Sequence, residues 1–316
     1  MAVTTTPHRL PAAVALAGAV LVGVLTAIQA RINGQLGLRL DDGFTAAVIS
    51  FGSGLVVLIV LSALLPAGRR GFRALASGVR ARTIPWWMLA GGAAGAFTVE
   101  TQGLAVAIIG VSLFTVGVVA GQTLSGLVLD RIGYGPAGVV AVTMPRVAGG
   151  GLALAAVAIS LQGGVLERVP WWMLVMPVIA GAGIAWQQAT NGRLRQRVGT
   201  PLTATLVNFI GGTAILLAVA VIHTVIAGPP AAYPTDPWLY LGGVVGVVYI
   251  FMSAALVVHT GVLLLGLGAV AGQLVTAFAL DALWPADAGT GWLIELAMVI
   301  VAGSGVAVAA APWRRR

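Results

Sequence analysis

The sequence predicts an all-α polytopic membrane protein of about ten transmembrane helices, arranged as two inverted five-helix repeats. Three observations predict it: extreme hydrophobicity, an internal repeat and a one-sided distribution of arginine. Of the 316 residues, 59% are hydrophobic and only 8% are charged, and the mean hydropathy is +1.01. Because a soluble domain carries roughly 25% charged residues, the lipid bilayer is the solvent that suits this composition.

Each half of the chain contains five apolar stretches, most of them long enough for the roughly 20 residues that a bilayer requires. The expected spans of the first half are 10–31, 44–65, 85–108, 110–130 and 137–160. Those of the second half are 170–190, 201–226, 237–258, 261–283 and 291–311. The first stretch is interpreted as a retained helix, since no clear signal-peptidase site closes it. Proline and tryptophan gather at the span ends, which is typical of an interfacial aromatic belt.

The two halves of the chain repeat each other. At an offset of 158 residues, Gln29-Ala30-Arg31-Ile32-Asn33-Gly34 aligns with Gln187-Gln188-Ala189-Thr190-Asn191-Gly192. At an offset of 151 residues, Gly110-Val111, Ala120-Gly121-Gln122 and Leu129-Asp130 align with Gly261-Val262, Ala271-Gly272-Gln273 and Leu280-Asp281. Polar matches in register with glycines rarely arise by chance in apolar helices. We therefore interpret the chain as a tandem duplication, with repeats at 1–165 and 166–316.

Arginine is distributed unequally between the two sides of the predicted membrane protein. Thirteen arginines fall on the side of the N-terminus, and three, Arg31, Arg39 and Arg168, fall on the other; Arg146 lies within a span and is left out. The positive-inside rule then predicts that both termini are cytoplasmic. Because five spans is an odd number, the second repeat must run inverted relative to the first. Inverted repeats commonly hold substrate near the bilayer midplane, between the two halves.

Several classes of function are not supported. The chain has no cysteine, which excludes disulfides and thiolate chemistry. The net charge of +8 comes from arginines in short loops and at the C-terminus, without a nucleic-acid-binding motif around them. The three histidines have no acids at ligand spacing, and no hydrolase or metalloprotease motif occurs. We therefore expect no enzyme activity, no cofactor, no metal and no nucleic-acid partner.

Glu100 is the one acid well inside a predicted span, with Thr98, Thr101 and Gln102 around it. An ionisable group at membrane depth is costly, and it indicates an ion or proton pathway or a substrate site. A protonated glutamate that donates to a neighbouring carbonyl is an equally weighted structural alternative. The position that matches Glu100 in the second repeat is Phe251, so the repeats differ here.

Gln122 and Gln273 are the other candidates for substrate contact. They fall near the middle of matching spans, where a neutral amide binds polar groups of a solute without the cost of a charge. Interhelical hydrogen bonds are the structural alternative. Trp186 and Gln187 lie deeper than most of the tryptophan belt, and Trp186 offers a π face to a cation. A position in the cytoplasmic belt also explains Trp186.

The remaining polar residues favour structural roles. Asn33 and Asn191 each precede a glycine, so a helix-ending turn is favoured at both over contact with substrate. Asp130 and Asp281 fall at span ends, where solvated or capping roles are cheap. Arg146 and Glu295 fall towards opposite faces and are expected to extend to the interface rather than pair.

The runs from Gln29 to Gly54 and from Pro85 to Gly133 resemble the YdcZ-like family of the drug/metabolite transporter superfamily. The most telling stretch is Pro85-Trp86-Trp87, Gly91-Gly92, Gly95, Gly110-Val111, Ala120-Gly121-Gln122, Leu129-Asp130 and Gly133. The resemblance covers both halves and implies a fused form of proteins that otherwise pair as antiparallel five-helix chains. One departure is Trp284-Pro285, which stands where the first half has Gly133.

These observations predict a secondary active transporter that exports a small organic solute across the bacterial inner membrane by alternating access. A non-transporting membrane scaffold or accessory subunit is the alternative that remains. The expected partners are a small-molecule substrate, with proton or cation coupling left open, and the lipid bilayer. A monomer and a homodimer are both compatible with the sequence.

Overall fold

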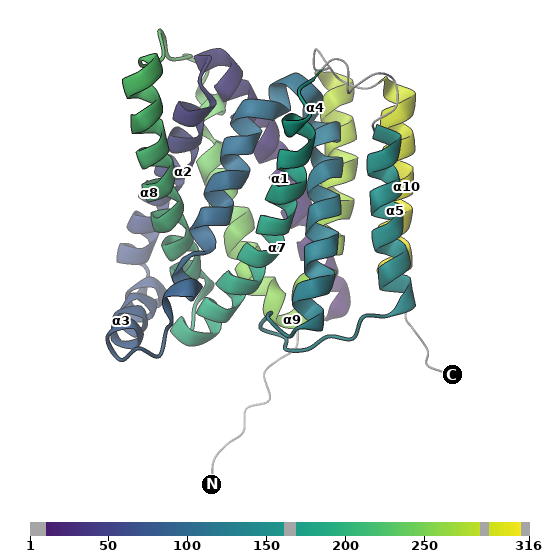
Figure 1. Cartoon of the computed structure of the whole chain (residues 1–316). Helices are drawn as coiled ribbons and strands as arrows, with labels where there is room; N and C mark the ends of the chain where they lie inside the picture. The colour runs from purple at the N-terminus through teal and green to yellow at the C-terminus, as the bar shows by residue number, and fades with distance from the viewer. Residues whose placement is uncertain (1–10, 161–168, 285–290, 311–316) are drawn as a thin grey trace.

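The computed structural model describes residues 11–160, 169–284 and 291–310, and all regular structure within them is helical (Figure 1). This confirms the all-helical prediction. The helices are α1 (Ala12–Leu40), α2 (Gly43–Leu64), α3 (Pro66–Arg80), α4 (Gly91–Arg131), α5 (Met144–Ser160), α7 (Trp172–Val198), α8 (Pro201–Ala227), α9 (Gly242–Leu283) and α10 (Trp292–Ala310). Two short 3-10 turns, η1 (Trp86–Leu89) and η2 (Pro237–Tyr240), precede α4 and α9.

Five of the described helices are long and apolar enough to cross a membrane. They are Ala13–Leu40, Gly43–Leu64, Trp86–Arg131, Pro201–Ala227 and Pro237–Leu283. The third and fifth are 46 and 47 residues long, about twice what a bilayer requires. Each is broken in its middle by a glycine in a non-helical conformation, Gly110 in α4 and Gly261 in α9. The breaks fall at the boundaries that the sequence predicted between consecutive spans.

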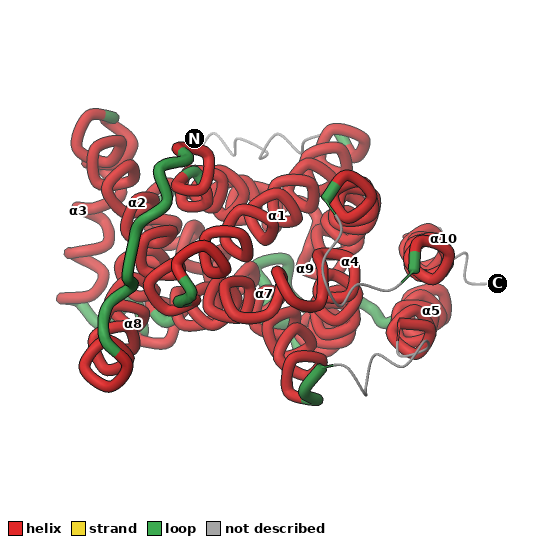
Figure 2. Tube along the Cα trace, turned by 90° about the horizontal axis from the view of Figure 1, so that it is seen from above, coloured by secondary structure: helices red, strands yellow, loops and turns green. Residues whose placement is uncertain are grey.

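The chain runs back and forth between two sides of the molecule. In Figure 1, α1 runs from the lower to the upper side, whereas α7, its sequence match, runs from the upper to the lower side. Helix α3 and the arginine-bearing ends of α4 and α7 lie at the lower side. Seen from above, α5 and α10 lie together at one edge and α3 lies at the opposite edge (Figure 2).

Helices α1 and α7 end later than the sequence predicted. They reach Leu40 and Val198, and each stops at a residue in the left-handed region, Asp41 at φ 50° and Gly199 at φ 77°. The predicted helix-ending turns at Asn33 and Asn191 were therefore wrong, since both residues lie inside helices and are buried. The polar residues in the last turns of α1 and α7 lower the local hydropathy, which is why the sequence predicted earlier ends. Buried hydrogen bonds between amide side chains, described below, allow both helices to continue.

The arginine-rich segment between α2 and α4 contains an amphipathic helix, α3, which the sequence analysis treated as a loop. Pro66 occupies its first turn, where a missing N–H costs nothing. Gly71 is buried against Thr200, the N-cap of α8, and Thr203 within that helix, while Arg69, Arg70 and Arg73 are exposed. A helix with one basic face and one packed face is typical of an element that lies along a membrane surface.

Close helix packing occurs at matching positions in the two halves. Helix α1 packs against α9, and α4 packs against α7. A Cβ at Gly23 of α1 would overlap the carbonyl oxygen of Ala269, and a Cβ at Gly181 of α7 would overlap that of Val118. Only glycine permits such close backbone approach. Between the two halves, the rings of Phe51 and Phe209 stack with centroids 4.7 Å apart in the core.

Candidate functional site

Two buried carboxylates hold the broken helices. The backbone at Gly110 has φ 83° and ψ 161°, so a new helix begins after it with unsatisfied N–H groups. Asp281, at the end of α9, accepts hydrogen bonds from the backbone N–H groups of Val111 (3.1 Å) and Ser112 (2.6 Å). The side chain therefore acts as an N-terminal cap for a helix 170 residues away in the chain.

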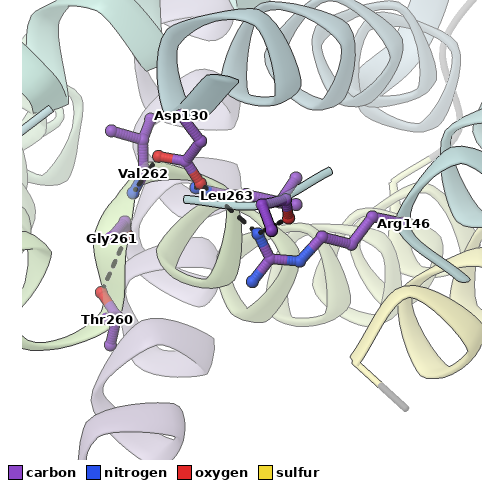
Figure 3. Close-up of polar contacts among 7 residues, drawn as sticks. Asp130, Arg146, Thr260, Gly261, Val262 and Leu263 are labelled. Carbon is purple, nitrogen blue, oxygen red and sulfur yellow. Dashed lines mark hydrogen bonds and ion pairs between the residues drawn. The ribbon is translucent and has the colours of Figure 1, made fainter. Parts of the chain in front are cut away.

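The same arrangement recurs at the other break. Gly261 has φ 74° and ψ 174°, and Asp130, at the end of α4, accepts hydrogen bonds from the N–H groups of Val262 (3.2 Å) and Leu263 (3.1 Å) (Figure 3). A carboxylate at a helix N-terminus is stabilised by the helix dipole and by charge-assisted hydrogen bonds. Helices α4 and α9 thus each provide a cap for the other.

Each capping aspartate has an arginine near it. Arg146 lies 3.9 Å from Asp130 and also donates to the carbonyl oxygen of Ala141 (Figure 3). Arg146 lies in the first turn of α5, which begins at Met144, and its pairing with Asp130 was not predicted. Arg31 is close enough to Asp281 for electrostatic attraction. Both aspartates are buried, so the capping alternative holds and the solvated alternative does not.

Two buried amide clusters occupy matching places. In the first, Asn33 donates to the Oε1 of Gln102 (2.8 Å), and Gln29 donates to the carbonyl oxygen of Gly242 (2.9 Å). In the second, Gln187 and Asn191 both donate to the Oδ1 of Asn208 at 3.0 Å. Gln187, predicted to contact substrate, therefore already uses its amide in a buried hydrogen bond.

Glu100 lies in the first part of α4 with both carboxylate oxygens buried and without a hydrogen-bond partner among the described residues. Its neighbours Thr98 and Thr101 donate instead to carbonyl oxygens of their own helix, those of Ala94 and Phe97. A buried acid without a partner is expensive in a membrane. The expected role of Glu100 in binding a proton or a cation stays a prediction.

Asp42 and His223 lie together near Glu100, and neither was predicted to be a site residue. Asp42 caps α2 by accepting from the N–H groups of Phe44 and Thr45, and its charge is close enough to repel that of Glu100. The Nδ1 of His223 lies 3.6 Å from the Oδ1 of Asp42, and its ring stacks on Phe44. Nothing in the sequence spacing connects these residues, because they come from three different helices.

Gln122 and Gln273 lie in the second parts of α4 and α9, and each is 2% exposed. Neither amide atom of Gln122 has a hydrogen-bond partner within the part of the chain that the structure describes. Its side chain lies next to Gly266 of α9. Trp186 is partly buried against the largest hydrophobic core cluster. No hydrogen bond joins Gln122 to Gln273 among the described residues, and their shared substrate role stays a prediction.

A cavity lies elsewhere, beside the last turns of α1. Its volume is about 570 Å³, within the range of roughly 300–1,000 Å³ that is usual for small-molecule sites. A smaller cavity of about 250 Å³ lies beside the end of α7. None of the five predicted site residues lines the larger cavity, and no cluster of three or more potential metal ligands occurs among the described residues.

One family model matches the chain twice, over residues 14–159 and 171–308. The family is described as "Putative inner membrane exporter, YdcZ". The chain belongs to this family. The YdcZ-like resemblance is thereby confirmed, and the protein is a multi-pass inner-membrane protein of a transporter family. One matched segment falls within each half of the chain.

One solved structure, titled "Crystal structure of protein", is similar to this YdcZ-family chain at 20% sequence identity and a TM-score of 0.54. The match covers 92% of this chain and 96% of the other. At this identity the likeness shows a shared fold and nothing about substrate. No curated protein sequence matches the chain.

Proposed function

We propose that this YdcZ-family protein is a secondary active transporter that exports a small organic solute by alternating access between two inverted five-helix repeats. The exchange of caps between Asp130 and Asp281 carries the proposal. Each carboxylate comes from one repeat and holds a broken helix of the other, at opposite ends of the molecule. Broken helices at a repeat interface are the usual place for substrate and ion sites in transporters.

The paired caps provide a mechanical basis for the alternating access in this proposal, in which the central site opens to one side of the membrane and then to the other. The second parts of α4 and α9 are joined at both ends, so they move as one unit. The other helices of each repeat contact this unit through glycine-rich surfaces, such as Gly23 of α1 against α9 and Gly181 of α7 against α4. Smooth surfaces of this kind tolerate small rotations. The two repeats therefore rock around the joined pair and expose a central site first to one side, then to the other.

Glu100 supplies the coupling in this proposal. Its carboxylate oxygens are buried and have no partner among the described residues, so the acid is held neutral or binds a cation when the site is closed. Proton binding on one side and release on the other would drive solute movement. Gln122 and Gln273 contribute amides for polar groups of the solute, with Trp186 and Gln187 nearer the cytoplasmic side. Both termini are cytoplasmic in this arrangement.

Flux measurement tests the proposal. The protein is reconstituted in liposomes that enclose a pH-sensitive dye, and a panel of small amines, organic acids and neutral metabolites is added under an imposed pH gradient. We expect at least one compound to move protons across wild-type vesicles and not across protein-free ones. A folded, reconstituted protein that moves no compound and no protons would favour the alternative, a scaffold or accessory subunit.

A further inference from the structure

The large cavity at the end of α1 combines apolar walls with two guanidinium groups. It lies between α1, η2 and the end of α9, on the upper side of the molecule in Figure 1. From α1 it is lined by Ile28, Arg31, Ile32, Gln35 and Arg39. These positions recur every three to four residues, so they form one face of the helix. The opposite wall consists of Trp238, Leu280 and Trp284.

Arg31 is the unusual member of this lining. It lies between two and three turns before the end of α1 and is half-buried. No hydrogen bond from its guanidinium occurs within residues 11–160, 169–284 and 291–310; its contacts there are the ring of Trp284, at 5.9 Å from the centroid, and the electrostatic attraction of Asp281. Both oxygens of Asp281 already accept from backbone N–H groups. An arginine has five N–H donors, so Arg31 lacks acceptors.

A second arginine that lies against aromatic rings, at the lower side of the molecule, provides a comparison for Arg31. Arg193, near the end of α7, lies over the rings of Trp87 and Tyr134 and also donates to the carbonyl oxygen of Gly133 at 2.7 Å. Trp87 is the sequence match of Trp238. An arginine beside an aromatic wall thus obtains a protein acceptor at the lower side, whereas Arg31 obtains none among the described residues.

We propose that this cavity binds a small amphipathic organic anion. Its carboxylate, sulfonate or phosphate group accepts hydrogen bonds from Arg31, and its apolar or aromatic body packs against Trp238, Leu280 and Trp284. A planar guanidinium binds such oxyanions through two parallel hydrogen bonds. Cations at membrane depth are stabilised by a counter-charge; Asp281 attracts Arg31 but already accepts two backbone hydrogen bonds, and the anion supplies the missing acceptors.

Arg39 adds a second charge at the mouth of the cavity. It forms an ion pair with Asp236 at 3.3 Å, with both side chains about half exposed. Exposed pairs of this kind contribute little free energy, so Arg39 is free to exchange Asp236 for an incoming anion. Two guanidiniums one above the other then guide the anionic group inwards. The identification of this anion as the exported solute rests on the proposed function. The binding of the anion to the cavity does not depend on that function.

Equilibrium binding with a matched pair of probes tests the site. The protein in phosphatidylcholine nanodiscs is titrated with 4-nitrobenzoate and with 4-nitrobenzamide, which has the same shape and no charge. We expect the anion to bind more tightly, and Arg31→Gln to weaken its binding at least about tenfold, as the loss of one charge-assisted hydrogen bond implies. The amide should bind both proteins alike. Equal binding of the two probes to wild type would overturn the proposal.

Two variants serve as controls for this titration. Arg70→Gln removes an exposed arginine of α3 on the other side of the molecule and should leave both affinities unchanged. Trp284→Leu keeps Arg31 and removes one aromatic wall, so it should weaken both probes by a similar factor. Melting temperatures without probe identify any variant that fails to fold. If Arg31→Gln fails to fold, the affinities of Trp284→Leu decide whether the probes bind in this cavity. Unchanged affinities in both Arg31→Gln and Trp284→Leu count against the cavity.

The source of the anion is decided by adding phosphatidylglycerol to the nanodiscs. A loss of 4-nitrobenzoate affinity that is larger in wild type than in Arg31→Gln identifies the lipid headgroup as the natural anion of the same site. An equal loss in both proteins reflects surface charge alone and assigns the site to a soluble organic acid. Binding without flux of any organic acid leaves the anion site intact and counts against the proposed transport.

Discussion

Asp130 and Asp281 make the same contact in opposite directions. Asp130 caps the helix that begins after Gly261, and Asp281 caps the helix that begins after Gly110. The two carboxylates join the second parts of α4 and α9 at both ends. This mutual exchange connects the two halves of the chain through four hydrogen bonds.

Removal of either charge should destabilise the folded protein. Asp130→Asn and Asp281→Asn each keep one acceptor but lose the charge at a helix N-terminus, so each should cost about 1–3 kcal/mol of unfolding free energy. Thermal unfolding in detergent measures this. Asp41→Asn, at an exposed position that already has left-handed φ, is the matched control and should change the melting temperature little. If the double variant loses less unfolding free energy than the two single variants lose together, the two caps act as one unit.

The two glycine breaks should not tolerate a side chain. Gly110 and Gly261 have positive φ with extended ψ, a region that is essentially confined to glycine. Alanine at either position should cost about 1–3 kcal/mol. Gly52→Ala is the control, because Gly52 is helical and a Cβ there meets nothing within 4 Å. That variant should be neutral or slightly stabilising. Equal melting temperatures for all three alanine variants would contradict a structural role of the breaks.

Glu100 should be required for coupling and dispensable for folding. Because its oxygens have no partner among the described residues, Glu100→Gln removes the titratable group without breaking a described hydrogen bond. We expect proton-driven flux to be lost, while size-exclusion profiles and the melting temperature stay as in wild type. Asp236→Asn, which removes an exposed acid, should keep proton-driven flux. Undiminished flux in Glu100→Gln would return Glu100 to a structural role.

The glutamine pair should affect substrate binding more than stability. Gln122→Ala and Gln273→Ala each remove an amide at matching depth in the joined helices. Loss of one hydrogen bond to a polar solute should weaken binding by about 0.5–1.5 kcal/mol. The affinity for any compound that scores in the flux assay is compared with the melting temperature of each variant. A large stability loss with unchanged affinity would mean that the amides serve the fold alone.

Reporter fusions test the proposed topology. Fusions after Arg73 and at Arg316 should both report a cytoplasmic location, and a fusion near Asp287 should report the external side. Arg316 and Asp287 lie outside the described residues, while Arg73 lies in α3 at the lower side of Figure 1. A fusion after Gly228, between α8 and η2, provides a second external position. Opposite locations for Arg73 and Arg316 would imply an odd number of spans and would exclude the inverted-repeat arrangement.

Sequence periodicity and composition were sufficient to predict the helical fold and most helix positions. The breaks at Gly110 and Gly261 coincide with predicted span boundaries, because consecutive glycine-bounded apolar runs are visible in the residues themselves. Helix ends were less predictable. The expected turns at Asn33 and Asn191 were wrong because hydropathy falls before the helix ends, and the amide partners that allow the helix to continue come from elsewhere in the chain.

The sequence by itself determined the membrane setting, the family and the internal duplication, since these depend on composition and on residues compared along one dimension. Only the tertiary structure decided the partners of the polar residues: Asp281 with Val111 and Ser112, Asp130 with Arg146, and Arg31 with a cavity in place of an acceptor. These contacts join residues on different helices. In a bilayer every buried polar group must find its partner within the protein, and which helix supplies that partner is set by packing, which no spacing along the chain records.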